Sequence, residues 1–268
     1  MAQLDHLPRD ASPPNQAAVL ESLAQRMRQI EGTRWSPGCD EVISSGHAAL
    51  DGLLPAGGFR RGTLVEWLAM RPASGAGMLA LLAARQALEA GGVLVVIDRA
   101  RRFYPPAAIS LGIALEQLIV VRPGSMANEA WALDQVLRWR GVAAAWCAVE
   151  RADDHTLRRW QLAVESSGTL GFLLRGEQAR GEPSWAELRL GIQPLARPAG
   201  ERSRARRLRV ELLRARTGQT GQTIELEIPE PKTWRGLHGW RGKQYETGSL
   251  HLAPSVAAAT TGRRSRRA

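Results

Sequence analysis

The residues with the clearest chemical potential form a glycine-containing loop, Arg71–Gly77. Loops that hold nucleoside triphosphates read GxxxxGK[ST]: the glycines let backbone N–H groups face the phosphates, the lysine reaches the terminal phosphates and the hydroxyl binds magnesium. Aligning the second glycine with Gly75 places Ala76 at the lysine position and Gly77 at the hydroxyl position. We therefore expect Ser74, Gly75, Ala76 and Gly77 to form a helix-start turn that binds no cofactor. By composition alone, an ordinary glycine-rich turn also explains the loop.

The segments on either side of the loop predict how it is positioned. Thr63–Leu68 alternates and is rich in residues that favour strands, whereas Met78–Ala90 contains good helix formers and ends at two glycines. A tight turn between a strand and a helix is the setting in which phosphate-binding loops occur. The loop therefore has the strand–turn–helix setting of a phosphate-binding site but lacks the lysine and the hydroxyl of such a site.

Apolar strands alternate with helices along the first two thirds of the chain. The further apolar strands are predicted at Val93–Asp98, Leu118–Val121, Val142–Val149 and Thr169–Leu174. Their alternation with helices predicts a mainly parallel sheet that is flanked by helices and joined by right-handed crossovers. In the C-terminal third, antiparallel strands are predicted at Trp185–Gln193, Arg206–Arg216 and Thr223–Ile228.

Two helices in this region have recognisable starts. A capping side chain accepts a hydrogen bond from a backbone N–H that the first helical turn leaves unpaired. Asn128 is expected to cap the helix Glu129–Arg140. Asp153 or Asp154 is expected to cap a helix that runs through Ser167 and is followed by Gly168.

The sequence from Ile43 to Glu66, ISSGHAALDGLLPAGGFRRGTLVE, resembles the opening of the RecA family core, whose pattern is ISTGS-x-x-LD-x-x-L-x-x-GG-x-x-x-G-x-x-x-E. The similarity continues through Phe103-Tyr104-Pro105 and Leu111-Gly112-Ile113 and covers roughly residues 16–175. This resemblance implies a RecA-like fold.

The same resemblance implies where catalytic residues would lie. In active RecA-type ATPases, a glutamate two residues after a strand-end aspartate positions the attacking water, but here Asp98 is followed by Arg99 and Ala100. An acidic residue should end the strand Val142–Val149 and support magnesium, and the nearest is Glu150. Phosphoryl transfer depends on positioned cations and an oriented nucleophile. We therefore expect no ATP hydrolysis and no enzymatic activity.

Among RecA-like proteins that lack these catalytic residues, the chain resembles the ImuA family. The resemblance implies a non-catalytic accessory protein of damage-induced (SOS) mutagenesis. Its implied partners in translesion DNA synthesis are an ImuB-like homologue of Y-family polymerases and an error-prone replicative-type polymerase, with RecA as a further candidate. Two alternatives stay open: a cell-division inhibitor of the SulA type, which shares a shortened RecA-like fold, and a divergent RecA-like ATPase.

Composition divides the chain into three parts. Residues 1–32 hold a polar start and an amphipathic helix, residues 33–232 the RecA-like core, and residues 233–268 a basic tail that is expected to be flexible. The apolar stripe of the helix is expected either to bind a partner or to fold back on the core, and it comprises Leu20, Leu23, Met27 and Ile30. Tryptophan–arginine pairs in the tail are expected to bind a partner, and they are Trp234, Arg235, Trp240 and Arg241.

The net charge of +10 points to nucleic acid or an acidic protein as a partner, although a compositional bias toward arginine explains the same number. Two arginine clusters are candidates for weak, non-specific contact with DNA phosphates: Arg202, Arg204, Arg206 and Arg207, and the terminal Arg263, Arg264, Arg266 and Arg267. The loop Arg175–Pro183 is a weaker candidate, because glutamates offset its arginines, and we expect a solvated turn there.

Membrane and metal sites are not indicated. No run approaches the ~18 apolar residues of a membrane span and no signal-peptide core is present, so the protein is expected to be cytoplasmic. Cys39 and Cys147 lack CxxC spacing and the histidines are scattered, so neither a disulfide framework nor a metal site is expected.

Overall fold

The structure is a computed structural model that describes residues 41–196, 205–218 and 220–229. Its helices are α2 (Ala48–Leu53), α3 (Ala76–Leu88), α4 (Pro105–Ser110), α5 (Met126–Arg138) and α6 (Asp154–Ser167), with short 3-10 helices η1 (Leu115–Gln117) and η2 (Glu177–Gly181). Its strands are β1 (Val42–Ile43), β2 (Phe59–Arg60), β3 (Leu64–Ala69), β4 (Val93–Ile97), β5 (Leu118–Val121), β6 (Val142–Ala148), β7 (Leu170–Gly176), β8 (Leu188–Pro194), β9 (Arg206–Ala215) and β10 (Thr223–Ile228). None of these helices is long and apolar enough to cross a membrane.

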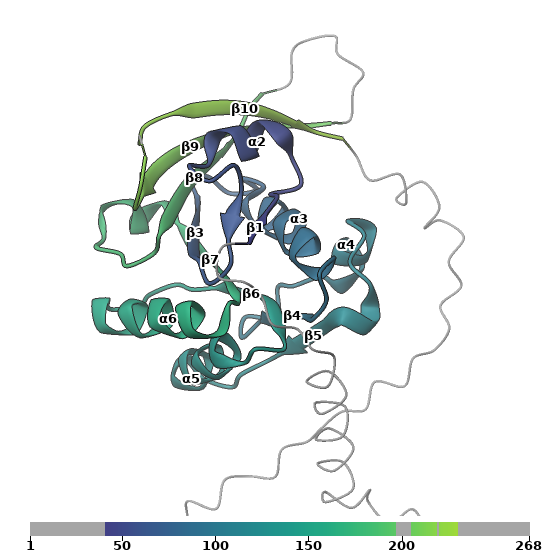
Figure 1. The fold of residues 1–268 in the computed structure, drawn as a ribbon, viewed down its shortest axis with the longest axis vertical. Coiled ribbons are helices and arrows are strands. Elements are labelled where there is room, and N and C mark those ends of the chain that lie inside the picture. Colours follow the sequence, from purple (N-terminus) through teal and green to yellow (C-terminus); the bar gives the residue numbers. More distant parts are fainter. Residues whose placement is uncertain (1–40, 197–204, 219, 230–268) are drawn as a thin grey trace, which may run out of the picture. The chain divides into compact units, whose positions relative to one another are not determined.

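Eight strands form one sheet in the order β10-β9-β8-β3-β7-β6-β4-β5 (Figure 1). Every neighbouring pair from β8 to β5 is parallel, whereas the β8–β9 and β9–β10 pairs are antiparallel. The predicted architecture is therefore confirmed: a mainly parallel sheet with antiparallel strands in the C-terminal third.

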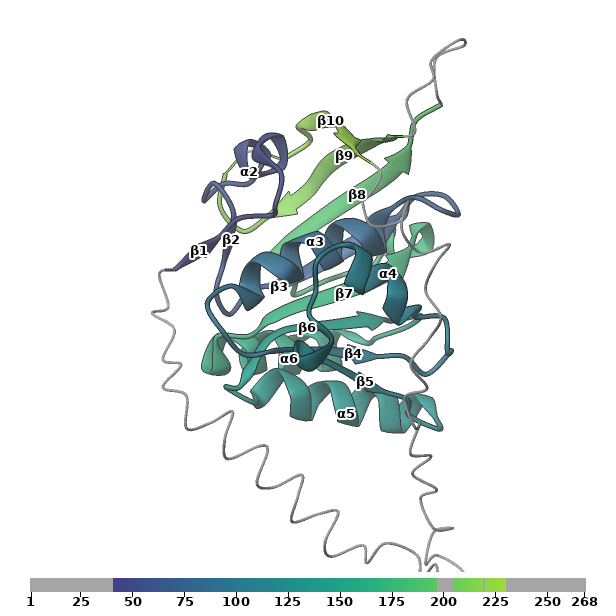
Figure 2. The same cartoon turned by 90° about the vertical axis from the view of Figure 1, so that its right-hand side faces the viewer.

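Helices cover both faces of the parallel part of the sheet (Figure 2). α3 packs in the cluster that contains Val65 and Trp67 of β3, whereas α5 and α6 pack in the cluster that contains Leu64. Neighbouring residues of β3 thus face opposite layers, as the two-residue period of a strand requires. This explains why the strand is apolar along most of its length.

Three aromatic rings fix the segment that leads into β3. Phe59 lies 5.8 Å from Trp67 and 5.8 Å from Phe172, and the Trp67–Phe172 centroid distance is 5.9 Å. The rings are tilted or edge-on, the arrangements that aromatic quadrupoles favour. The loop after β3 therefore starts from a closely packed part of the sheet.

The serines of the ISSG motif bind the aspartate that follows in α2. The Ser44 hydroxyl donates to Asp51 Oδ2 at 2.6 Å, and the Ser45 backbone N–H donates to Asp51 Oδ1 at 2.6 Å. Asp51 therefore stabilises the turn ahead of α2, which gives these motif residues a structural role.

The two predicted helix caps have different outcomes. Asp153 caps α6, because its Oδ1 accepts the Thr156 N–H at 2.7 Å, and this prediction is confirmed. The prediction that Asn128 caps α5, the helix before α6, was wrong, because Ser125 is the N-cap of α5. Ser125 has extended backbone angles, and its hydroxyl accepts the Asn128 N–H at 3.2 Å. The helix therefore starts earlier than its apolar pattern suggested, because the cap is set by backbone geometry that periodicity does not report.

Candidate functional site

The loop between β3 and α3 has the helix-start geometry of a phosphate-binding loop. Gly75 has a φ of +86° and precedes the first helical residue, and its carbonyl accepts the Leu79 N–H at 3.0 Å. The Ala76 N–H donates to the Ser74 hydroxyl at 3.2 Å. This N–H, which would face a phosphate in an active site, is thus satisfied within the loop.

Apolar side chains pack closely against the loop and the start of α3. A Cβ on Gly75 would lie 2.9 Å from Leu208 Cδ1, and a Cβ on Gly77 would lie 3.0 Å from Leu174 Cδ2 and 3.3 Å from Trp146 Cζ2. A hydroxyl-bearing side chain at residue 77 would therefore require Leu174 and Trp146 to move.

The carboxylate of Asp98 supports the turn after β4. It accepts the backbone N–H groups of Arg102 at 2.8 Å and Phe103 at 3.1 Å, and Arg122 Nε lies 3.8 Å away. The turn carries Ala100 at the position where the resemblance implied a glutamate. Asp98 is therefore occupied in holding this turn.

Arg99 neutralises two acidic side chains beside the turn. Its Nε lies 3.0 Å from Glu129 Oε2, and its terminal nitrogen lies 3.4 Å from Glu150 Oε2. The hydrogen bond with Glu129 raises the pKa of the Arg99 guanidinium above its ordinary value, and Glu150 adds to the shift. Glu150, the acid that could have supported magnesium, is thus paired with an arginine.

A pocket of about 340 Å³ opens at the carboxyl ends of β4, β6 and β7, beside the loop. Its lining includes Ile97, Asp98, Arg99, Arg102, Glu129, Trp146, Ala148, Val149, Glu150, Leu174, Arg175 and Gln178. Open α/β sheets bind ligands at the carboxyl ends of their strands. Trp146, Glu129 and Gln178 were not predicted as site residues from the sequence. The one available signal was a tryptophan within the otherwise small-residue strand VAAAWCAV.

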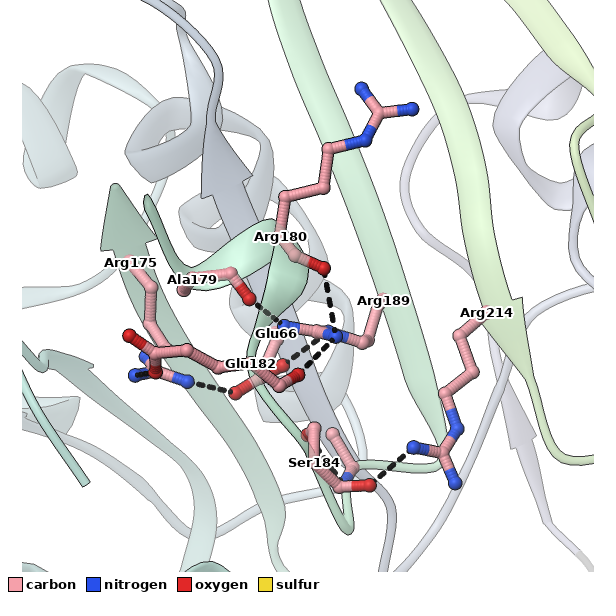
Figure 3. A network of polar contacts seen from close by, with 9 residues as sticks. Glu66, Arg175, Ala179, Arg180, Glu182, Ser184, Arg189 and Arg214 are labelled. Atoms are coloured by element: carbon pink, nitrogen blue, oxygen red, sulfur yellow. Dashed lines mark hydrogen bonds and ion pairs between the residues drawn. The ribbon is translucent and has the colours of Figure 1, made fainter. Parts of the chain in front are cut away.

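A buried ionic network centred on Glu66 of β3 adjoins the pocket, because Arg175 belongs to both (Figure 3). Glu66, which is fully buried, forms ion pairs with Arg175 at 2.9 Å and Arg189 at 2.6 Å. Arg175 also pairs with Glu182 at 2.5 Å, and Arg189 donates to the Glu182 carbonyl at 3.0 Å and to the carbonyl of Ala179. The network attaches η2 and the chain after it to the sheet.

This network corrects the prediction for the Arg175–Pro183 loop. Arg175 is only 3% exposed and lies at the end of β7, so it is neither a solvated turn residue nor available to DNA. Arg180 pairs with Glu211 at 3.0 Å. The sequence showed the charge balance of the loop but not that Glu66, more than a hundred residues earlier, is its main partner.

The remaining predicted contact residues are only partly within the described structure. Arg206 and Arg207 begin β9, as the strand predicted at Arg206–Arg216 implied, and Arg207 pairs with Glu225 at 3.3 Å. The other predicted DNA-contacting and partner-binding residues lie outside the described residues: Leu20, Leu23, Met27, Ile30, Arg202, Arg204, Trp234, Arg235, Trp240, Arg241, Arg263, Arg264, Arg266 and Arg267.

Metal ligands do not cluster in the part of the chain that the structure describes: three or more His, Cys, Asp or Glu side chains do not converge there. Cys147 is buried in β6, and burial raises the pKa of its thiol well above the ordinary range. A buried thiol of high pKa is a poor nucleophile.

Comparison with known proteins supports the RecA-like fold. The RecA N-terminal domain family matches residues 36–142. Protein RecA of Corynebacterium efficiens is 42% identical over 83 residues, which is 31% of this chain and 21% of that protein. The crystal structure of the RadB recombinase superposes with a TM-score of 0.56 at 18% identity, covering 70% of this chain and 97% of that one.

One similarity extends over nearly the whole of both chains. Protein ImuA of Caulobacter vibrioides (strain NA1000 / CB15N) is 30% identical over 242 residues, which is 83% of this chain and 95% of that protein. The RadB and RecA similarities are shorter or more distant, but they agree with it in fold. This chain therefore belongs to the ImuA family of RecA-like proteins.

Proposed function

We propose that this protein is a non-hydrolysing RecA-like accessory protein of damage-induced mutagenesis that supports translesion DNA synthesis. Membership of the ImuA family supports its place in mutagenesis. The observation that carries the proposed lack of hydrolysis is the apolar filling of the nucleotide site, where Trp146 and Leu174 pack against Gly77. Ala76 and Ala100 stand where a cation and a water-positioning carboxylate are needed.

Its proposed partners are an ImuB-like protein, an error-prone polymerase and RecA. We propose that the core of residues 33–232 is a scaffold and that the flanking segments, residues 1–32 and 233–268, supply much of the contact with partners. Tryptophan and arginine, which the tail contains, are the residue types that most often dominate binding energy in protein interfaces. We propose that the protein acts in the cytoplasm. Direct contact with DNA is proposed to be weak and non-specific, and to involve arginines other than Arg207 and Arg209 of β9, which pair with Glu225.

The function is tested in a deletion strain by counting ultraviolet-induced mutations to antibiotic resistance. We expect the induced mutation frequency to fall toward the spontaneous level and to be restored by the full chain. A chain that carries Arg140→Ala, an exposed substitution, serves as the control and should restore it fully. An unchanged induced frequency in the deletion strain would contradict the proposal.

Affinity capture from damaged, nuclease-treated cells distinguishes the adaptor from a division inhibitor. We expect the full chain to retain an ImuB-like polymerase homologue and a chain truncated after Lys232 to lose it. If instead the tubulin-like division protein is retained and overproduction blocks septation, the SulA-type alternative is correct.

A further inference from the structure

We propose that the pocket at the carboxyl ends of β4, β6 and β7 binds an apolar group that carries a carboxylate, supplied by an acidic–apolar peptide segment of a partner protein. This inference rests on the proposed function in one respect: it assumes that the carboxylate-bearing group belongs to a partner protein. The chemistry of the pocket itself is argued from its lining and can be tested without any mutagenesis assay.

The walls of the pocket are apolar where a nucleotide site would be polar. They include Ile97, Trp146, Val149 and Leu174, and the pocket measures about 340 Å³. This volume is at the small end of the ~300–1,000 Å³ typical of ligand pockets. It therefore suits one large apolar side chain better than a nucleoside triphosphate.

Hydrogen-bond donors at the pocket lack acceptors. The Nε1–H of Trp146 is buried and has no hydrogen-bond partner among the described residues. Arg102 lines the pocket and is exposed, and its guanidinium forms no ion pair within the described part of the chain. A ligand carboxylate that reaches Arg102 would gain a charge-assisted hydrogen bond, whereas the buried Trp146 indole lines the pocket and would respond to the ligand through contact with its ring.

The acidic side chains of the lining are already engaged. Asp98 accepts two backbone N–H groups, and Glu129 and Glu150 both pair with Arg99. An incoming carboxylate would therefore find Arg102 as its available cation. A run of successive phosphates would need several unpaired cations, whereas one carboxylate beside an apolar group needs only Arg102.

The test uses two blocked dipeptides as probes, N-acetyl-phenylalanyl-glutamate amide and its glutamine counterpart. The readout is the indole N–H signal of Trp146 in the nitrogen–proton correlation spectrum of the full chain, assigned by its loss in Trp146→Phe. We expect the glutamate probe to shift this signal at millimolar concentration and to bind about tenfold more tightly than the glutamine probe, as a charge-assisted hydrogen bond predicts.

Two arginine variants identify the cation. Arg102→Ala should reduce the preference for the glutamate probe to near unity, whereas Arg140→Ala, an exposed arginine at the opposite end of the sheet, should leave it unchanged. Equal binding of both probes, or no shift with either at about 10 mM, would overturn the proposal. A shift caused by a ten-nucleotide oligothymidylate but not by the dipeptides would make the pocket a nucleic-acid site instead. None of these outcomes depends on whether the protein acts in mutagenesis.

Discussion

At the scale of single residues, the loop between β3 and α3 differs from a phosphate-binding loop both in its own residues and in the side chains that pack against it. The loop lacks its lysine and hydroxyl, and side chains from β6, β7 and β9 fill the space beside its glycines. We therefore expect that restoring one residue type would not restore nucleotide binding, because apolar side chains pack against the loop glycines as well.

A substitution at Gly77 tests this packing. Gly77→Thr places a Cβ within 3.0 Å of Leu174 and 3.3 Å of Trp146, so we expect it to lower the free energy of unfolding by ~1–3 kcal/mol. Gly52→Thr is the matched control, because no atom lies within 4 Å of a Cβ at that position of α2 and its effect should be within ~0.5 kcal/mol. Urea unfolding of both variants measures the difference, and equal effects would contradict the packing argument.

A measurement of ATP hydrolysis tests the residues of the loop. Neither the wild type nor the Ala76→Lys variant is expected to release phosphate from ATP, because Ala100 supplies no carboxylate and the helix start is packed against Trp146. Phosphate release is measured with an active RecA protein as the positive control. ATP turnover by the wild type above the rate of a heat-denatured sample would refute the proposed lack of hydrolysis.

The N-cap residue Asp153 makes the stability of the fold depend on pH. The backbone and side-chain hydrogen bonds from Thr156 lower the pKa of the Asp153 carboxyl in the folded state. The ionised carboxylate therefore stabilises the fold above the ordinary aspartate pKa of about 3.9. This stabilisation is lost as the pH falls through the lower pKa of the folded state. Asp153→Asn keeps an N-capping side chain without a charge. The difference in melting temperature between wild type and Asp153→Asn should therefore be larger near pH 6.5 than near pH 2.5, and a constant difference would show that the charge contributes nothing.

At the scale of elements, the buried network decides the conformation of the chain between β7 and β8. The 3-10 helix η2 is held to the sheet by contacts with Glu66, Arg175 and Arg189. A segment held by buried ion pairs cannot move independently of the sheet, since separation would leave charges unpaired in the interior.

Removal of the central carboxylate tests this attachment. Glu66→Gln leaves two buried guanidiniums without their shared anion and is expected to cost ~3–5 kcal/mol of unfolding free energy. It should also speed amide hydrogen exchange in residues 177–187 more than in β6. Glu225→Gln, which breaks the exposed pairs with Arg207 and Arg209, is the control and should cost less than ~1 kcal/mol. Similar costs for both variants would mean that the network does not hold η2.

At the scale of the whole molecule, most of the excess positive charge lies outside the closely paired core. Residues 233–268 contain six arginines, Arg235, Arg241, Arg263, Arg264, Arg266 and Arg267, and Lys243, against the single acid Glu246. We expect weak binding of single-stranded oligothymidylate at low salt to weaken further when the chain is truncated after Lys232 and when salt is raised, because counterion release drives such binding. Fluorescence anisotropy measures both effects, and affinity that is independent of salt would contradict an electrostatic contact.

The sequence by itself determined the fold class, the strand order along the chain and the loss of charged groups from the loop. Apolar periodicity, glycine positions and the ISSG pattern are local signals, so strands such as Leu118–Val121 were predicted with the observed bounds. Only the tertiary structure decided which side chains pack against the loop. Leu208, Trp146 and Leu174 come from different strands, and Glu66 meets Arg175 across β3 and β7. Because these contacts join residues that are far apart in the chain, neither propensity nor spacing could report them.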